Sequence, residues 1–201
     1  IPPVYLTATY QFENSEELID VVQNRSGYIY SRWDNPSVKE VENKMAALEG
    51  TEQALCFASG MASITTAVMS QVKAGGRVVA MREIYGGTFE LLQDVLPALN
   101  IQTEFVNCWN TEALLKEIEK GVSVLYLETP TNPLLRVVDV KPLAEAAHQK
   151  GAVVILDATF ATPVNQRSAD LGVDIVIHSA TKYIGGHHDV TAGVACCHRP
   201  F

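Results

Sequence analysis

The chain has 201 residues, which is enough for one ordinary domain. Hydrophobic residues make up 47% and charged residues 19% of the chain, as is typical of a soluble globular protein with a sizeable core. The formal net charge of -8 argues against a general nucleic-acid binder and against binding to an anionic membrane surface. No apolar run approaches the roughly 18 residues that span a bilayer.

The four cysteines form no C-x-x-C pair, which makes a zinc site unexpected and indicates a reducing, cytoplasmic location. The start of the chain, Ile1-Pro2-Pro3, has neither an initiator Met nor the basic-then-apolar pattern of a signal peptide. This start indicates a trimmed or processed chain.

From about Gln53 onward, short apolar runs alternate with segments of helical length. The predicted strands are Gln53–Phe57, Arg77–Met81, Ile101–Val106, Val122–Leu127, Val153–Asp157, Asp174–His178 and Ala192–Cys197. The predicted helices are Met61–Lys73, Thr88–Leu99, Thr111–Lys120 and Val140–Lys150. Such an alternation is typical of a largely parallel sheet with helices on both faces.

The first fifty residues follow another pattern. Loop and short-helix signals extend to about Gly27, Tyr28–Pro36 is predicted to be extended, and Val38–Glu49 reads as an amphipathic helix. We therefore expect an N-terminal arm and helix over residues 1–50 and one α/β domain over residues 51–201.

Lys182 follows the predicted strand that ends at His178. An amine at a strand end lies where open α/β sheets form their binding crevices, and partial desolvation there would make it a nucleophile toward carbonyl compounds. A Thr-Lys pair taken alone is more often a surface lysine in a Gly-rich loop. Ser179 and Thr181 place two hydroxyl groups beside this amine.

The segment Ser59-Gly60-Met61-Ala62 joins a predicted strand to a predicted helix. The N-terminus of a helix presents free N–H groups, and glycine lets a phosphate approach the backbone. Most such segments are only tight turns. Together with Ser179 and Thr181, however, this one forms a plausible phosphate site.

Further polar residues follow other predicted strands. Asp157 ends a run of four apolar residues, so its carboxylate needs a cation or hydrogen-bond donors unless it simply caps the strand end. Tyr85, beside Gly86 and Gly87, could stack on an aromatic ring or be an ordinary loop residue. Asn132, between two prolines, could donate to a ligand or form an Asx-turn.

Tyr30 and Arg32 alternate in the segment predicted to be extended, and therefore point to the same side. A phenol and a guanidinium on one face suit an anion, although an exposed pair on an arm is the commoner arrangement. No metal site is expected from His187-His188-Asp189, because adjacent residues rarely chelate one ion. The chain contains no G-x-G-x-x-G or Walker-type motif, so a dinucleotide or NTP site is not expected either.

In their order along the chain, these motifs resemble the Cys/Met-metabolism family of enzymes that depend on pyridoxal 5'-phosphate (PLP). This family includes cystathionine γ-synthases and γ-lyases, methionine γ-lyases and homoserine sulfhydrylases. The resemblance implies the large domain of a fold-type-I PLP-dependent transferase, with a mostly parallel seven-stranded sheet, helices on both faces and an N-terminal arm. From this resemblance we expect the chain to lack the C-terminal domain of the family, with its substrate-binding arginine.

The resemblance also implies the roles of individual residues. Lys182 forms a Schiff base with PLP, the internal aldimine, and acts in catalysis with Tyr85 and Asp157. Tyr30 and Arg32 reach the PLP phosphate of a neighbouring subunit, so the protein is a homodimer or homotetramer with shared active sites. The implied cofactor-binding residues are Tyr30, Arg32, Gly60, Met61, Tyr85, Asn132, Asp157, Thr159, Ser179, Thr181 and Lys182.

The implied reaction is β/γ-elimination or γ-replacement on cystathionine, methionine or cysteine, or an O-acylhomoserine. The sequence leaves open which of these reactions occurs, and a truncated PLP-binding scaffold without turnover is the alternative. The family usually has Asn at the position of Ala158, and methionine γ-lyases commonly have Cys at the position of Gly87. The second difference weakly disfavours a methionine γ-lyase.

Overall fold

The computed structural model describes residues 2–198. The fold divides into an N-terminal unit up to Lys44 and a C-terminal unit from Met45 onward, and the division falls within helix α2 (Pro36–Glu49). Within residues 2–198, no helix has both the length and the apolar character needed to cross a membrane.

The N-terminal unit contains helix α1 (Ser15–Asn24) and the first turns of α2. The side chain of Asn14 caps α1 by accepting a hydrogen bond from the Glu17 N–H at 2.9 Å. Arg25, in the left-handed conformation with φ 51°, ends the helix. None of the α1 residues is buried.

The prediction of an extended Tyr28–Pro36 segment is wrong. The N–H groups of Trp33 and Asp34 both donate to the Tyr30 carbonyl, at 2.8 and 3.2 Å, and so close a turn. The side chain of Asn35 then fixes the start of α2, because its Oδ1 accepts the Ser37 N–H at 2.8 Å. The expectation that the Tyr30 and Arg32 side chains point to the same side depended on an extended backbone. The turn removes that basis.

The C-terminal unit is built on one seven-stranded sheet in the order β1-β7-β6-β5-β4-β2-β3. Strands β3, β2, β4, β5 and β6 run parallel, and β7 is antiparallel to both of its neighbours. The mostly parallel sheet predicted from the sequence is thus confirmed. The strands are β1 (Gln53–Phe57), β2 (Arg77–Met81), β3 (Gln102–Val106), β4 (Val124–Glu128), β5 (Val153–Asp157), β6 (Ile175–His178) and β7 (Gly193–Cys197).

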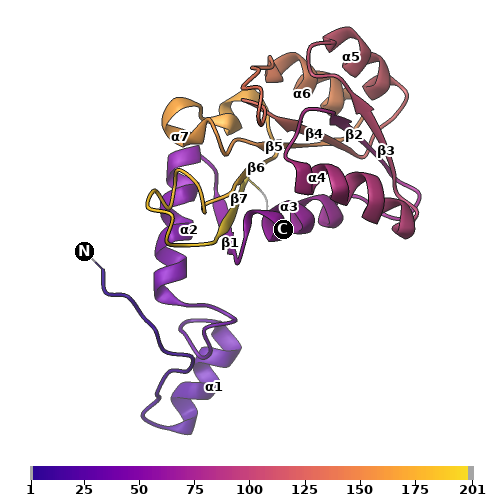
Figure 1. Ribbon diagram of the computed structural model, residues 1–201. Helices are drawn as coiled ribbons and strands as arrows, with labels where there is room; N and C mark the ends of the chain where they lie inside the picture. The colour runs from indigo at the N-terminus through magenta and orange to yellow at the C-terminus, as the bar shows by residue number, and fades with distance from the viewer. Residues whose placement is uncertain (1, 199–201) are drawn as a thin grey trace. The chain divides into compact units, whose positions relative to one another are not determined.

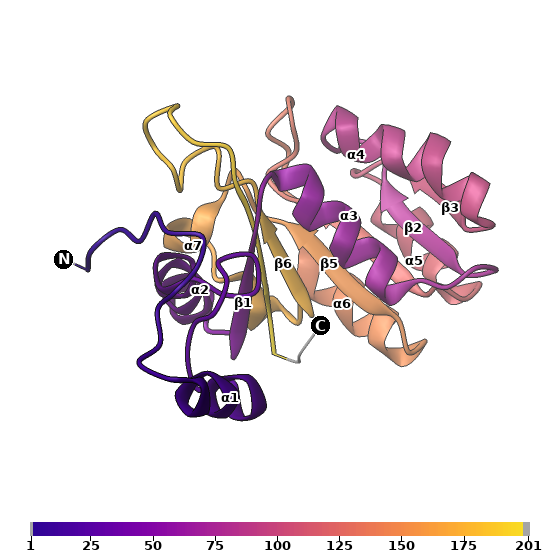
Figure 2. The ribbon, with the colours of Figure 1, turned by 90° about the horizontal axis from the view of Figure 1, so that it is seen from below.

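Helices cover both faces of this sheet, as predicted. Helix α3 (Gly60–Gln71) packs on β7, β6, β1 and β5, whereas α5 (Thr111–Glu119) and α6 (Val140–Gln149) pack on each other and on β2 to β5. Figures 1 and 2 show α3 and α4 (Gly86–Glu90) on one face and α5 and α6 on the other. Helix α7 (Thr162–Asn165) and the short 3-10 helix η3 (Ser168–Leu171) connect β5 to β6.

The predicted helix Thr88–Leu99 is helical but not one regular α-helix. It begins as α4, continues as a π-helix over Leu91–Val95 (η1) and ends as a 3-10 helix over Leu96–Leu99 (η2). Proline has no N–H to donate to a preceding carbonyl, so Pro97 interrupts the regular hydrogen-bond pattern here.

Parallel strands covered on both faces must be apolar throughout, and the central strands meet this requirement. Every residue of β4 and β6 is buried, and so is every residue of β5 except Val153. The four cysteines lie within the described part of the chain and are thiols, three of them buried.

A buried ion pair joins the end of α2 to the end of β6. The His178 Nε2 and Glu49 Oε1 atoms are 2.6 Å apart, and Glu49 Oε2 also accepts the Ser168 N–H at 3.0 Å. Both side chains of the pair have essentially no exposed surface. A buried charge without a partner is strongly destabilising, so each of the two groups depends on the other.

Replacing Glu49 by Ala should lower the free energy of unfolding by about 3–5 kcal/mol, because the substitution leaves His178 buried without its partner. Urea denaturation of the complete protein measures this change. The matched control is Glu52→Ala, which removes an exposed glutamate nearby in the chain. Equal stability of the two variants would show that the pair contributes nothing.

Candidate functional site

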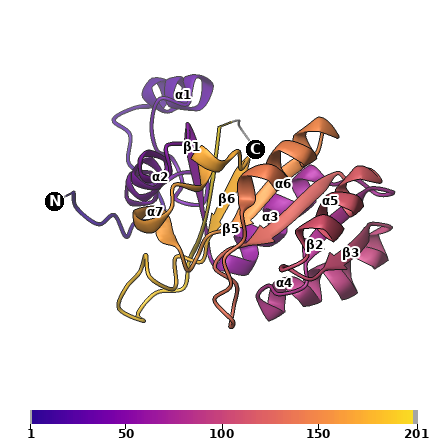
Figure 3. The same ribbon diagram turned by 90° about the horizontal axis from the view of Figure 1, so that it is seen from above.

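A pocket of about 460 Å³ lies at the edge of the sheet where β4, β5 and β6 end. Figure 3 shows the loop after β4 and the loop before β7 projecting from this same edge. Every predicted site residue of the C-terminal unit lines the pocket: Gly60, Met61, Tyr85, Asn132, Asp157, Thr159, Ser179, Thr181 and Lys182. The structure therefore brings together residues from five separate connections of the fold.

Tyr30 and Arg32 lie in the N-terminal unit, and the side chains of both are exposed. Their contact with the cofactor of a neighbouring subunit stays a prediction. Within the N-terminal unit, Tyr30 is 42% and Trp33 65% exposed.

Lys182 lies in a turn that hydrogen bonds hold in place after β6. Its N–H donates to the Ser179 carbonyl at 3.0 Å, and its carbonyl accepts the Gly186 N–H at 2.9 Å. The Thr181 hydroxyl both donates to the Ala192 carbonyl and accepts the Ala192 N–H, at 3.1 and 3.0 Å. The Lys182 side chain is exposed, so the desolvation expected from the sequence is not found.

The start of α3 meets the segment after β6 at a close approach. The Ser59 side chain caps the helix by accepting the Ala62 N–H at 3.1 Å. A Cβ atom at Gly60 would lie only 2.8 Å from both Cβ and Oγ of Ser179, so only glycine allows this contact. Because a helix N-terminus attracts anions, Gly60, Met61 and the Ser179 hydroxyl are placed to bind a phosphate group.

Asp157, at the end of β5, is 5% exposed. Its Oδ1 accepts the Thr159 hydroxyl at 2.6 Å and the Thr159 N–H at 3.0 Å. Burial raises the pKa of Asp157, whereas the Thr159 hydrogen bonds and the nearby His178 lower it. Among residues 2–198 no donor reaches Oδ2, so this oxygen can accept an N–H from a ligand.

Sequence reasoning missed Glu128, which also lines the pocket and is 5% exposed. It pairs with Asp157 across β4 and β5, and its two oxygens accept the N–H groups of Tyr85 and Asn132, each at 2.8 Å. Burial and the neighbouring Asp157 raise the pKa of Glu128 to about 8, against the effect of these two hydrogen bonds. The sequence contains one signal that could have identified Glu128: like Asp157, it ends an apolar run.

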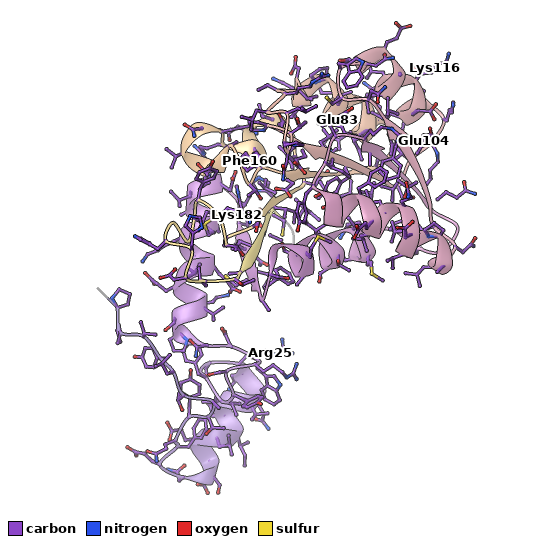
Figure 4. The ribbon with its side chains drawn as sticks, in the orientation of Figure 1. Arg25, Glu83, Glu104, Lys116, Phe160 and Lys182 are labelled. Carbon is purple, nitrogen blue, oxygen red and sulfur yellow. The ribbon has the colours of Figure 1, made fainter. Side chains whose placement is uncertain are left out.

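The remaining wall of the pocket is mainly apolar. Phe160 packs edge-on against Tyr183, with 6.2 Å between the ring centroids, and it lines the pocket together with Lys182, which is also labelled in Figure 4. Tyr85 is 45% exposed, and a Cβ atom at Gly87 would lie 2.9 Å from its ring. The other lining residues that the sequence did not indicate are Ser59, Ile64, Pro130 and Thr191.

No group of three or more His, Cys, Asp or Glu side chains within the described residues is placed to hold a metal ion. His187, in the exposed loop before β7, contacts the Gly185 carbonyl through Nδ1 at 3.1 Å.

Comparison with known proteins relates both sequence and fold to enzymes. The family model described as "Cys/Met metabolism PLP-dependent enzyme" matches residues 1–200. The chain is 42% identical to cystathionine gamma-synthase 1, chloroplastic, of Arabidopsis thaliana over 96% of this chain and 35% of that protein. It is also 42% identical to L-methionine gamma-lyase of Fusobacterium nucleatum subsp. nucleatum, over 96% of this chain and 49% of the relative.

Solved structures show the same relationship. The crystal structure of metB from Corynebacterium glutamicum superposes with a TM-score of 0.91 at 34% identity, over 99% of this chain and 50% of that one. The cystathionine gamma synthase of Xanthomonas oryzae pv. oryzae, solved with aminoacrylate and cysteine, has a TM-score of 0.90 at 29% identity and is covered over 49% of its chain. The chain thus spans half or less of the length of these proteins.

Replacing Gly60 by Ala should weaken PLP binding by about tenfold or more, because the added methyl group pushes Ser179 away from the helix N-terminus. Fluorescence titration of the cofactor-free protein with PLP measures the affinity. Gly86→Ala is the matched control, since a Cβ at this helix start meets nothing within 4 Å. If both variants bound PLP with the affinity of the wild type, the contact between Gly60 and Ser179 would not matter for binding.

Proposed function

The chain belongs to the family of PLP-dependent enzymes of cysteine and methionine metabolism, and we propose that its pocket holds PLP with Lys182 bonded to the aldehyde carbon of the cofactor. The family is PLP-dependent, as the resemblance of the motifs implied. The observation that carries the proposal is the meeting of three groups in one pocket. These are the Lys182 amine, the Asp157 carboxylate with an open oxygen, and the N-terminus of α3 beside Ser179.

These residues fit the chemical groups of PLP. The close approach of Gly60 to Ser179 leaves backbone N–H groups and a hydroxyl for the phosphate. Asp157 Oδ2 would accept the N–H of the protonated ring nitrogen, and Tyr85 would supply an aromatic surface for the ring. Asn132 and Thr159 line the same pocket, and Thr181 holds the Lys182 turn through its bonds to Ala192.

Each residue then has a task in the reaction. When bound, PLP supplies an electron-withdrawing ring that stabilises negative charge at the α-carbon of an amino acid. Asp157 would keep the ring nitrogen protonated. The Lys182 Nζ atom would act as the base that removes the proton from the α-carbon of the substrate. Tyr85 would assist this proton transfer.

The proposed substrates are sulfur amino acids or homoserine esters. Three of the relatives, a cystathionine gamma-synthase, a methionine gamma-lyase and a cystathionine gamma-lyase, are 41–42% identical to this chain. These names support either γ-replacement or elimination at the β- or γ-carbon. A cytoplasmic location stays a prediction from the cysteine usage.

Lys182→Ala should abolish the visible absorbance band of the bound cofactor while the far-UV circular dichroism stays unchanged. In the wild type, borohydride should bleach this band and leave a pyridoxyl group on the peptide that contains Lys182. Lys116→Ala, on the outer helix α5, is the control and should keep the band. A band that survives Lys182→Ala would refute the assignment, and a band without turnover of cystathionine or an acylhomoserine would leave a PLP-binding scaffold.

We further propose that the active sites are shared between subunits of a homo-oligomer. In the N-terminal unit, Arg32 and Trp33 are exposed, and none of the residues of α1 is buried. An arginine with aromatic neighbours suits a phosphate on another subunit, and an exposed apolar surface of this kind calls for a partner.

Mixing Arg32→Ala and Lys182→Ala subunits of the complete protein should restore activity, because each heterodimer contains one site with both wild-type residues. Random mixing predicts recovery of about a quarter of the wild-type activity, since half of the dimers are mixed and each of these carries one intact site out of two. Confirmed heterodimers without any activity would show that Arg32 acts within its own subunit.

A further inference from the structure

Two buried carboxylates lie side by side at the floor of the pocket, and the proposed function uses only Asp157. We propose that Glu128 is a positioning residue that ties the loop of Tyr85 and the loop of Asn132 to the floor, beside Asp157, and so sets where these two side chains meet the cofactor. This inference rests on the proposed function.

The hydrogen bonds of Glu128 join two separate connections of the fold. Its Oε2 accepts the N–H of Tyr85, which follows β2, and its Oε1 accepts the N–H of Asn132, which follows β4 itself. Both bonds are 2.8 Å long, and the carboxyl group is almost completely buried. The Glu128 side chain therefore connects both loops to the end of β4.

The chemistry of the carboxylate suits this task. A carboxylate has two acceptor oxygens and no donor, so it satisfies two N–H groups at once. Glutamine has one acceptor oxygen and would keep only one of these bonds. Aspartate has both oxygens but is shorter by one methylene, so it would reach neither N–H from the same backbone position.

The charge of Asp157 also acts on Glu128, because it adds to burial in raising the pKa of Glu128. The two residues are register partners on β4 and β5, and both line the pocket. The other titratable groups around the pair are the buried Tyr126 on β4, His178 on β6, and Tyr85 and Lys182 at the pocket. With a pKa of about 8, Glu128 adds its negative charge beside Asp157 only above this pH.

The first measurement is amide hydrogen exchange on the complete, cofactor-free protein, which reads the two loops without PLP. In Glu128→Asp the N–H groups of Tyr85 and Asn132 should both exchange about tenfold faster or more, and in Glu128→Gln at least one of them should. The matched control is Glu83→Gln. Glu83 accepts the Cys108 N–H at 2.6 Å but does not line the pocket, so this variant should leave both loop amides unchanged.

The second measurement is the affinity for PLP as a function of pH. Binding weakens at acid pH as Asp157 becomes protonated, because the ring-nitrogen contact needs the carboxylate. Because the pKa of Glu128 is about 8, its side chain is already neutral on this acid limb, and both variants should leave the limb in place. Glu128→Gln should instead remove the change in affinity around pH 8 that ionisation of Glu128 causes, whereas Glu128→Asp should keep a titrating carboxyl group beside Asp157. A residue that served only stability would leave the pH profile of both variants like that of the wild type.

Wild-type exchange rates at Tyr85 and Asn132 in both variants would overturn the proposal. A change in PLP affinity around pH 8 that is as large in Glu128→Gln as in the wild type would overturn it as well. A different measurement tests the proposed function itself: if the pocket does not bind PLP through Lys182, the wild type lacks the absorbance band that borohydride bleaches. Because Glu128→Gln has almost the same shape as the wild-type side chain, it serves as the test if Glu128→Asp does not fold.

Discussion

The register of three parallel strands is the constraint on which the site depends. Glu128 at the end of β4 pairs with Asp157 at the end of β5, and Asp157 pairs with Ile177 near the end of β6. Since parallel strands deliver their carboxyl ends to one edge, the segments after them converge there. A shift of one residue in this register would turn the carboxylates to the opposite face of the sheet and dismantle the pocket.

The electrostatics of the pocket result from the same arrangement. Two carboxylates are buried next to each other, and no basic side chain in the described part of the chain forms an ion pair with either. Hydrogen bonds from Thr159 and from the backbone offset part of the cost of desolvation, and His178 lowers the pKa of Asp157. Such a pocket favours a ligand that brings positive charge to Asp157.

The sequence predicted the scaffold better than the irregular segments. The bounds of β1, β2 and β5 agree with the prediction, because their apolar runs stop sharply at polar or turn residues. The turn at Trp33 escaped prediction, since aromatic residues favour strands and a local hydrogen bond decided otherwise. Glu128 was missed for a different reason: its importance comes from a strand neighbour 29 residues away, which only the sheet register reveals.

The Thr181–Ala192 pairing has a consequence for how this fold can vary. Hydrogen bonds between Thr181 and Ala192 join the two ends of the loop that connects β6 to β7, so the loop begins and ends at the same point of the sheet edge. Lys182 lies at the start of this loop, where its N–H donates to the Ser179 carbonyl and its carbonyl accepts the Gly186 N–H. These bonds hold its turn whatever follows Gly186, and the entropy of closing a loop changes only slowly with its length. Insertions, deletions and substitutions between Gly186 and Val190 can therefore accumulate among descendants of one ancestor while Lys182 keeps its position.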